Sequence, residues 1–177
     1  MIREVDKKRV LYSLKNYVNM INYPLSYKDD FCFYNKNFNF NCYAYAMGFK
    51  RLDNFKSLSN NGLSVYNPGT ISNFDNIFYD EIKLIKAFLE DCYVLGIECK
   101  PTSIDSNISN DVSKIAIYIE PSDENIVRDF HFARLNSNGI WSNMNGAGGN
   151  VTILGDDNIE NIPGYDFLGA YTLRKKK

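Results

Sequence analysis

The spacing of apolar residues changes along this chain from a helical pattern to an extended one. Residues 8–21 and 78–95 carry apolar side chains three and four positions apart, which predicts two amphipathic helices. From residue 97 onward, short segments alternate apolar and polar residues, which predicts strands. Helices followed by strands with short turns favour the α+β class, with N-terminal helices packed on an antiparallel sheet.

The predicted strands are joined by recognisable turns. The sequence Asn136-Ser137-Asn138-Gly139 is typical of a tight hairpin turn. Residues 52–77 are expected to form a long surface loop with a turn at Asn67-Pro68-Gly69 and another at Asn60-Asn61-Gly62. We expect a sheet of about five strands. The candidate segments are 97–99, 114–120, 127–135, 140–144, 151–154 and 168–173.

Composition predicts one domain over residues 1–177, because 177 residues with 45% hydrophobic content can bury a single core. The net charge is -1, and the basic residues are scattered except near each end, which argues against nucleic acid as a partner. No apolar run reaches the roughly 20 residues of a membrane span, and the first residues lack a signal-peptide core. We therefore expect no membrane partner and synthesis in the cytoplasm, with any release depending on lysis or dedicated secretion.

The chain has four cysteines and one histidine, which limits the metal sites that it can form. No Cys-x-x-Cys pair occurs, so we expect neither a structural zinc nor any other cofactor. Without a secretory signal, disulfides are disfavoured as well. Cys92 and Cys99 flank the end of a predicted helix and are interpreted as small buried apolar residues.

Cys42 lies where a short helix is predicted to begin. Asn41 is a favourable N-cap, and Gly48 is a plausible stop signal. The unpaired N–H groups and positive dipole end of a helix N-terminus favour a thiolate. The pattern therefore predicts that Cys42 is a nucleophile.

His131 lies in a predicted strand and is the candidate base for that thiol. Strand alternation turns Phe130 and Phe132 to one face and His131 and Ala133 to the other, where the small alanine would leave room for a substrate. The hairpin brings the next strand beside His131. Its side chains could orient the imidazole, and the sequence leaves three candidates open: Ser142, Asn143 and Asn145. Trp141 is interpreted as a core or cleft-wall residue, with Ser142 and Ala133 as further cleft candidates.

Three segments together resemble the papain-like cysteine peptidase superfamily. They are Asn41-Cys42-Tyr43-Ala44-Tyr45-Ala46 with Gly48, Phe130-His131-Phe132, and Gly139-Ile140-Trp141-Ser142. The similarity is closest to the NlpC/P60-type bacterial branch and to uncharacterised small relatives, whose closing strand also resembles Phe167-Leu168-Gly169-Ala170-Tyr171. The resemblance implies a papain-like fold.

The resemblance also implies roles for individual residues. Cys42 matches the nucleophile, His131 the base and Asn143 the third residue, although the small relatives often carry histidine and then lysine where this chain has Asn143 and Met144. The backbone N–H of Cys42 would form part of an oxyanion hole. The second donor would come from the segment before it: Asn37, which is favoured, Asn35 or Tyr34.

These expectations lead to three hypotheses of function. The first is a bacterial or phage cysteine hydrolase, a peptidase or amidase, that cleaves an amide through a thioester. Its substrate would be a peptidoglycan peptide or an intracellular protein. The second is an acyltransferase or transglutaminase that uses the same pair of residues. The third is a non-catalytic binding or effector module on the same fold.

Overall fold

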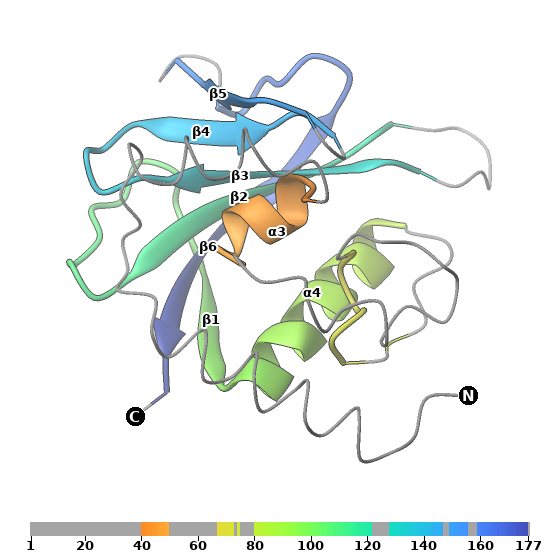
Figure 1. The fold of residues 1–177 in the computed structure, drawn as a ribbon, viewed down its shortest axis with the longest axis vertical. Helices are drawn as coiled ribbons and strands as arrows, with labels where there is room; N and C mark the ends of the chain where they lie inside the picture. The colour runs from red at the N-terminus through yellow and green to blue at the C-terminus, as the bar shows by residue number, and fades with distance from the viewer. Residues whose placement is uncertain are drawn as a thin grey trace.

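The computed structural model describes residues 40–49, 67–72, 74, 80–121, 128–146, 149–155 and 159–176. Its elements are α3 (Cys42–Ala46), α4 (Glu81–Leu95), β1 (Ile97–Thr102), β2 (Ser113–Ile119), β3 (Phe130–Leu135), β4 (Trp141–Met144), β5 (Val151–Ile153) and β6 (Asp166–Lys175) (Figure 1). The predicted helix over 8–21, the turn at Asn60-Asn61-Gly62 and the oxyanion candidates Asn37, Asn35 and Tyr34 lie outside the described residues.

The strands form one antiparallel sheet in the order β1-β6-β2-β3-β4-β5. The α+β class is therefore confirmed, and the described sheet has six strands rather than about five. The last strand of the chain, β6, lies between β1 and β2, which are neighbours in sequence. Pro101 lies in β1, at an edge of the sheet, where a missing N–H is tolerated.

The two described helices, α3 and α4, cover the same face of the sheet (Figure 1). Their buried side chains share one apolar cluster with inward residues of the strands, among them Ile117 of β2 and Phe132 of β3. A second cluster on the opposite face contains Tyr118, Ala133 and Trp141, and Ile159 from the segment before β6 packs against them. The centre of the sheet is therefore buried on both faces, and adjacent residues of a central strand enter different clusters.

The cap of α3 and the end of α4 agree with the sequence prediction, whereas α4 begins at Glu81 rather than at residue 78. The side chain of Asn41 accepts a hydrogen bond from the backbone N–H of Ala44 at 2.9 Å, which caps α3. Asp80 caps α4 in the same way through Lys83. Gly96 ends α4 with φ of 72°, a left-handed conformation that favours glycine.

A buried polar network fixes α3 on the sheet. The hydroxyl of Tyr45 lies 2.6 Å from that of Ser142 on β4, and Ser142 also accepts from Asn136 at 2.7 Å. The Arg134 guanidinium on β3 lies 4.0 Å from the centre of the Tyr45 ring and donates to the Tyr45 carbonyl at 3.1 Å. A cation at this carbonyl also complements the negative end of the short helix. The helix is thus tied to both strands that carry the candidate site.

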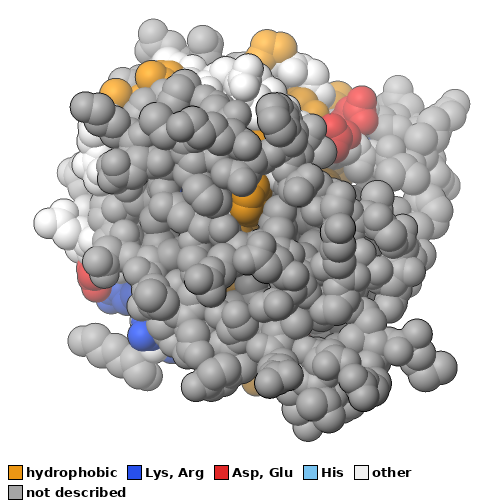
Figure 2. All heavy atoms as spheres, in the orientation of Figure 1, with side chains coloured by type: hydrophobic (Ala, Val, Ile, Leu, Met, Phe, Trp, Pro, Cys, Tyr) orange, Lys and Arg blue, Asp and Glu red, His pale blue; other side chains and the backbone are white. Residues whose placement is uncertain are grey.

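The described surface is mixed in character. Apolar side chains are visible along the top of the face shown in Figure 2, over the β4–β5 side of the sheet, and Ile153 of β5 is 55% exposed. Within the described residues, no helix has the length and apolar character needed to cross a membrane.

Candidate functional site

Cys42 is the first residue of α3, and its sulfur contacts the backbone of β3. Sγ lies 3.7 Å from the carbonyl oxygen of Phe130, to which the thiol donates. The backbone N–H of Phe132 also hydrogen-bonds the sulfur. The thiol therefore touches the residues on both sides of His131, as expected if the two segments form one site.

This contact is possible because β3 and β4 separate at that level. The two strands pair only from Ala133 to Leu135 on β3, and the Asp129 carbonyl accepts from the backbone N–H of Glu120, the residue after β2. In an antiparallel sheet, alternate residues direct their backbone groups to opposite neighbours. Phe130 and Phe132 consequently direct theirs to the side from which β4 has diverged, and Cys42 occupies that position.

Asn143 holds the imidazole of His131. Its side-chain nitrogen lies 2.7 Å from Nε2 of the ring, and its oxygen accepts from the hydroxyl of Thr152 on β5. Of the three candidates that the sequence left open, Asn143 contacts the ring. Asn145 is exposed, and Ser142 points to the opposite face toward Tyr45.

Two tyrosines flank the same imidazole. The ring of Tyr165 lies 5.3 Å from that of His131, centre to centre, and the ring of Tyr118 lies 6.1 Å away. The Tyr165 hydroxyl donates to the Asp129 carboxylate at 2.8 Å. The sequence analysis did not identify Tyr165 or Thr152. The signal available for Tyr165 was the turn-forming Pro163-Gly164 just before the last strand, and no local signal identified Thr152.

The resting thiol is neutral. Cys42 is 3% exposed, and burial raises the pKa of its thiol to about 12. The backbone N–H groups of Phe132, Tyr43 and Cys42 lower that pKa, and the charge of Asp129 raises it. The helix N-terminus thus acts in the predicted direction. Loss of hydration outweighs it, because the charged form loses its water.

The resting imidazole is neutral too. His131 is 5% exposed, and burial lowers the pKa of the ring to about 4, while the charge of Asp129 raises it. No hydrogen bond joins the thiol to the ring within the described part of the chain. Any reaction at this site therefore begins from two neutral groups, rather than from a thiolate and an imidazolium.

The three cleft candidates are buried. Ala133 belongs to the second apolar cluster and is 0% exposed, so the space beside His131 is filled by neighbours such as Ile159. Trp141 is a core residue of the same cluster. Ser142 serves the network that anchors α3. The expectation that Ala133 leaves open room on this face is wrong for the state described.

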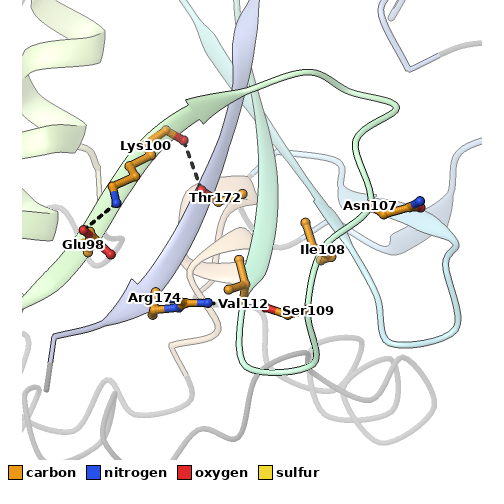
Figure 3. A pocket seen from close by; sticks show the side chains of 8 residues that line it. All are labelled: Glu98, Lys100, Asn107, Ile108, Ser109, Val112, Thr172 and Arg174. Atoms are coloured by element: carbon orange, nitrogen blue, oxygen red, sulfur yellow. Dashed lines mark hydrogen bonds and ion pairs between the residues drawn. The ribbon is translucent and has the colours of Figure 1, made fainter.

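A described surface groove lies elsewhere, between β1, β6 and the loop before β2 (Figure 3). The cations that line it have acidic partners. Lys100 lies 2.8 Å from Glu98, and Arg174 lies 3.3 Å from Asp111. This groove therefore offers no uncompensated charge to a ligand. Among the described residues, no group of three or more His, Cys, Asp or Glu side chains could hold a metal.

The buried carboxylate of Asp91 on α4 is hydrogen-bonded to α3. Asp91 of α4 accepts from the Tyr43 hydroxyl at 2.9 Å and from the backbone N–H groups of Gly69 at 2.8 Å and Ser72 at 2.7 Å. The segment that contains Gly69 also reaches Asn41, whose side chain donates to Asn67 at 3.0 Å. Burial raises the pKa of Asp91 to about 6, and its hydrogen bonds lower that pKa.

Comparison of the chain with protein-family models, with curated proteins and with solved structures found no match in any of the three.

Proposed function

We propose that this chain is a cysteine hydrolase with a papain-like arrangement, in which Cys42 attacks an amide and His131 transfers the proton. The observation that carries the proposal is the contact of Sγ with the backbone on both sides of His131, together with the Asn143 contact on Nε2 at 2.7 Å. The candidate nucleophile, base and orienting group come from α3, β3 and β4, and the Cys42 sulfur lies against the backbone of the strand that carries His131.

The proposed reaction passes through a thioester. The Cys42 thiol gives its proton to His131 as sulfur bonds to the carbonyl carbon, and His131 passes that proton to the leaving amine as the carbon–nitrogen bond breaks. Water then attacks the thioester, its proton goes to His131, and the sulfur recovers a proton when it leaves. The backbone N–H groups at the start of α3 are suited to stabilise the oxyanion. A peptide of peptidoglycan or an intracellular protein is the proposed substrate class.

The resting pair combines a weak base with a weak acid. An imidazole with a pKa of about 4 is unprotonated at neutral pH and able to accept a proton, and it becomes a strong acid once it is protonated. A strong acid protonates a leaving amine readily. The main barrier is the transfer of the proton from Cys42 to His131, because the pKa of the thiol is about 12. A substrate that excludes water and brings an electrophilic carbon to the sulfur would lower that barrier.

A non-catalytic binding module is the second candidate, and the burial of Cys42 favours it. The Cys42 thiol is 3% exposed and has a pKa of about 12, and these properties are typical of a structural cysteine. In that case, His131 and Asn143 would be a satisfied polar pair in a buried sheet.

Acylation by a small activated ester distinguishes the two candidates. We expect p-nitrophenyl acetate to add one acetyl group to the intact protein, with the adduct mapped to Cys42 by mass spectrometry. Cys42→Ala should abolish the adduct and His131→Ala should greatly slow its formation, whereas Cys99→Ala, which removes another free thiol, should retain it. A labelled amine added to the acylated protein then separates acyl transfer from hydrolysis. An adduct of equal amount in Cys42→Ala would overturn the hydrolase and favour the binding module.

A further inference from the structure

Three side chains form a continuous polar row across three adjacent strands. His131 lies on β3, Asn143 on β4 and Thr152 on β5. Asn143 pairs directly with Thr152 and is diagonal to His131, because its partner on β3 is Ala133. Directly paired and diagonal residues on one face of a sheet are close enough to interact. Thr152 thus reaches the imidazole through the amide of Asn143.

The amide of Asn143 has two different ends, and Thr152 engages one of them. The Thr152 hydroxyl donates to Oδ1 of Asn143, so the NH₂ end faces Nε2 of His131 at 2.7 Å. An amide NH₂ group only donates hydrogen bonds. Nε2 must therefore be the unprotonated nitrogen, and the neutral ring carries its proton on Nδ1.

That tautomer matters for the proposed reaction. With Nε2 engaged by Asn143, only Nδ1 is left to accept the proton of Cys42, and in this arrangement Nδ1 already carries one. Turning the amide by half a rotation would place Oδ1 on Nε2–H and the NH₂ end on the Thr152 oxygen. A threonine hydroxyl is able to accept as well as donate, so the turned amide would still be hydrogen-bonded, but the described orientation is the one in which Thr152 donates to Oδ1. A valine at position 152 would neither donate to nor accept from Asn143.

We infer that Thr152 is a positioning residue that holds the Asn143 amide in one of two orientations and thereby sets which nitrogen of His131 is protonated. In the described arrangement the base is blocked, and rotation of the amide releases it. This inference rests on the proposed function, because the tautomer has consequences only if His131 accepts the proton of Cys42. The chemical role assigned to Thr152 is hydrogen-bonding alone, with no contact to substrate.

The single histidine of the chain makes the tautomer directly measurable. Protein labelled with ¹⁵N-histidine gives one imidazole spin system, and the protonated nitrogen resonates far upfield of the bare one. At pH 7.5 we expect Nδ1 to be the protonated nitrogen in the unmodified chain. Thr152→Ser should keep this pattern, because serine retains the hydroxyl. Thr152→Val should move the proton wholly or partly to Nε2, so that the two nitrogen shifts approach or exchange places.

Asn143→Asp provides the second variant, since a carboxylate only accepts and should fix the proton on Nε2. Thermal unfolding of each variant confirms that the labelled protein is folded. Nε2–H in the unmodified chain, or unchanged ¹⁵N shifts in Thr152→Val, would overturn the inference. The readout does not depend on activity. A chain whose tautomer responds to Thr152 but whose Cys42 is never acylated refutes the hydrolase and leaves this inference standing.

Discussion

The Asn143 side-chain nitrogen lies 2.7 Å from Nε2 of His131, and the two side chains share the face of the sheet opposite α3. Cys42 reaches the same place from the helix side, through the opening between β3 and β4. The candidate site is therefore assembled across the sheet rather than on one face of it.

Replacement of Asn143 should slow acylation of Cys42 without abolishing it. The ring would lose the contact that fixes its orientation but would keep the flanking rings of Tyr118 and Tyr165. We expect Asn143→Ala to lower the acylation rate on the order of tenfold, less than the loss in His131→Ala. Asn145→Ala is the matched control, since that side chain is exposed, and its rate should equal that of the unmodified chain. Equal acylation rates in Asn143→Ala and Asn145→Ala would exclude a role for Asn143.

The buried Arg134 should contribute far more stability than an exposed arginine. Its guanidinium lies over Tyr45 and donates to the Tyr45 carbonyl and to Asn136. Arg134→Ala removes the charged donor from both buried acceptors and the cation from the face of the Tyr45 ring, and we expect a loss of about 3 kcal/mol in the free energy of unfolding. Arg174→Ala removes only a partly exposed ion pair with Asp111, and should cost less than about 1 kcal/mol. Urea unfolding of the two variants measures both values, and similar losses would contradict this view of the network.

Asp91 should make the protein less stable as the pH rises through about 6. Burial raises the pKa of Asp91 from 3.8 to about 6, so the folded state binds the proton more tightly than the unfolded state does. The resulting stabilisation is complete below pH 3.8 and is lost as the pH rises through 6, with a total of about 3 kcal/mol. Asp91→Asn does not titrate, so its urea-unfolding free energy should lack this component between pH 4 and 7.

His131 changes the stability of the folded state in the opposite direction over part of the same pH range. Its pKa falls from 6.5 to about 4 on folding, so its contribution is present above pH 6.5 and is lost as the pH falls through 4. The comparison of Asp91→Asn with the unmodified chain cancels this term, because both proteins keep His131. A pH-independent difference between them would show that Asp91 is not the titrating group.

Lys114 should hold the loop between β1 and β2. Its ammonium donates to the carbonyl oxygens of Ser103, Ile104 and Ser106, and the residue is 1% exposed. Lys114→Met keeps the length of the side chain and removes these donors, so hydrogen exchange at residues 103–109 should become faster. Lys100→Met is the control, because Lys100 is exposed and pairs with Glu98, and its exchange pattern should be unchanged. Loop exchange that is equally fast in both variants would refute the anchoring role.

Local signals in the sequence predicted much of this structure. The Asn41 cap, the end of α4 at Gly96 and the turn at Asn136–Gly139 depend on a few adjacent residues, and all three are confirmed. The position of β6 between β1 and β2 depends on long-range pairing, which no adjacent residues encode. The predicted strand 168–173 also proved longer, as Asp166–Lys175.

The surroundings of the candidate site were harder to predict from the sequence. The start of a helix correctly predicted N–H groups around the Cys42 sulfur, but the thiol pKa follows burial, which is a tertiary property. Ala133 was expected to border open space, and it packs against Ile159 from a segment that sequence periodicity does not place. Thr152 belongs to the site because it pairs with Asn143, and this pairing depends on the register of the edge strand β5.

The pH dependence of Cys42 acylation tests the central claim most directly. The rate with p-nitrophenyl acetate is measured from pH 4 to 9 in the unmodified chain and in His131→Ala. If His131 is the base, the unmodified chain should reach half its maximal rate near pH 4, the pKa of the ring, and remain level above it. His131→Ala should be slower and rise about tenfold per pH unit, because only the thiolate of a group with a pKa of about 12 then reacts. Parallel rising profiles for the two proteins would contradict the account.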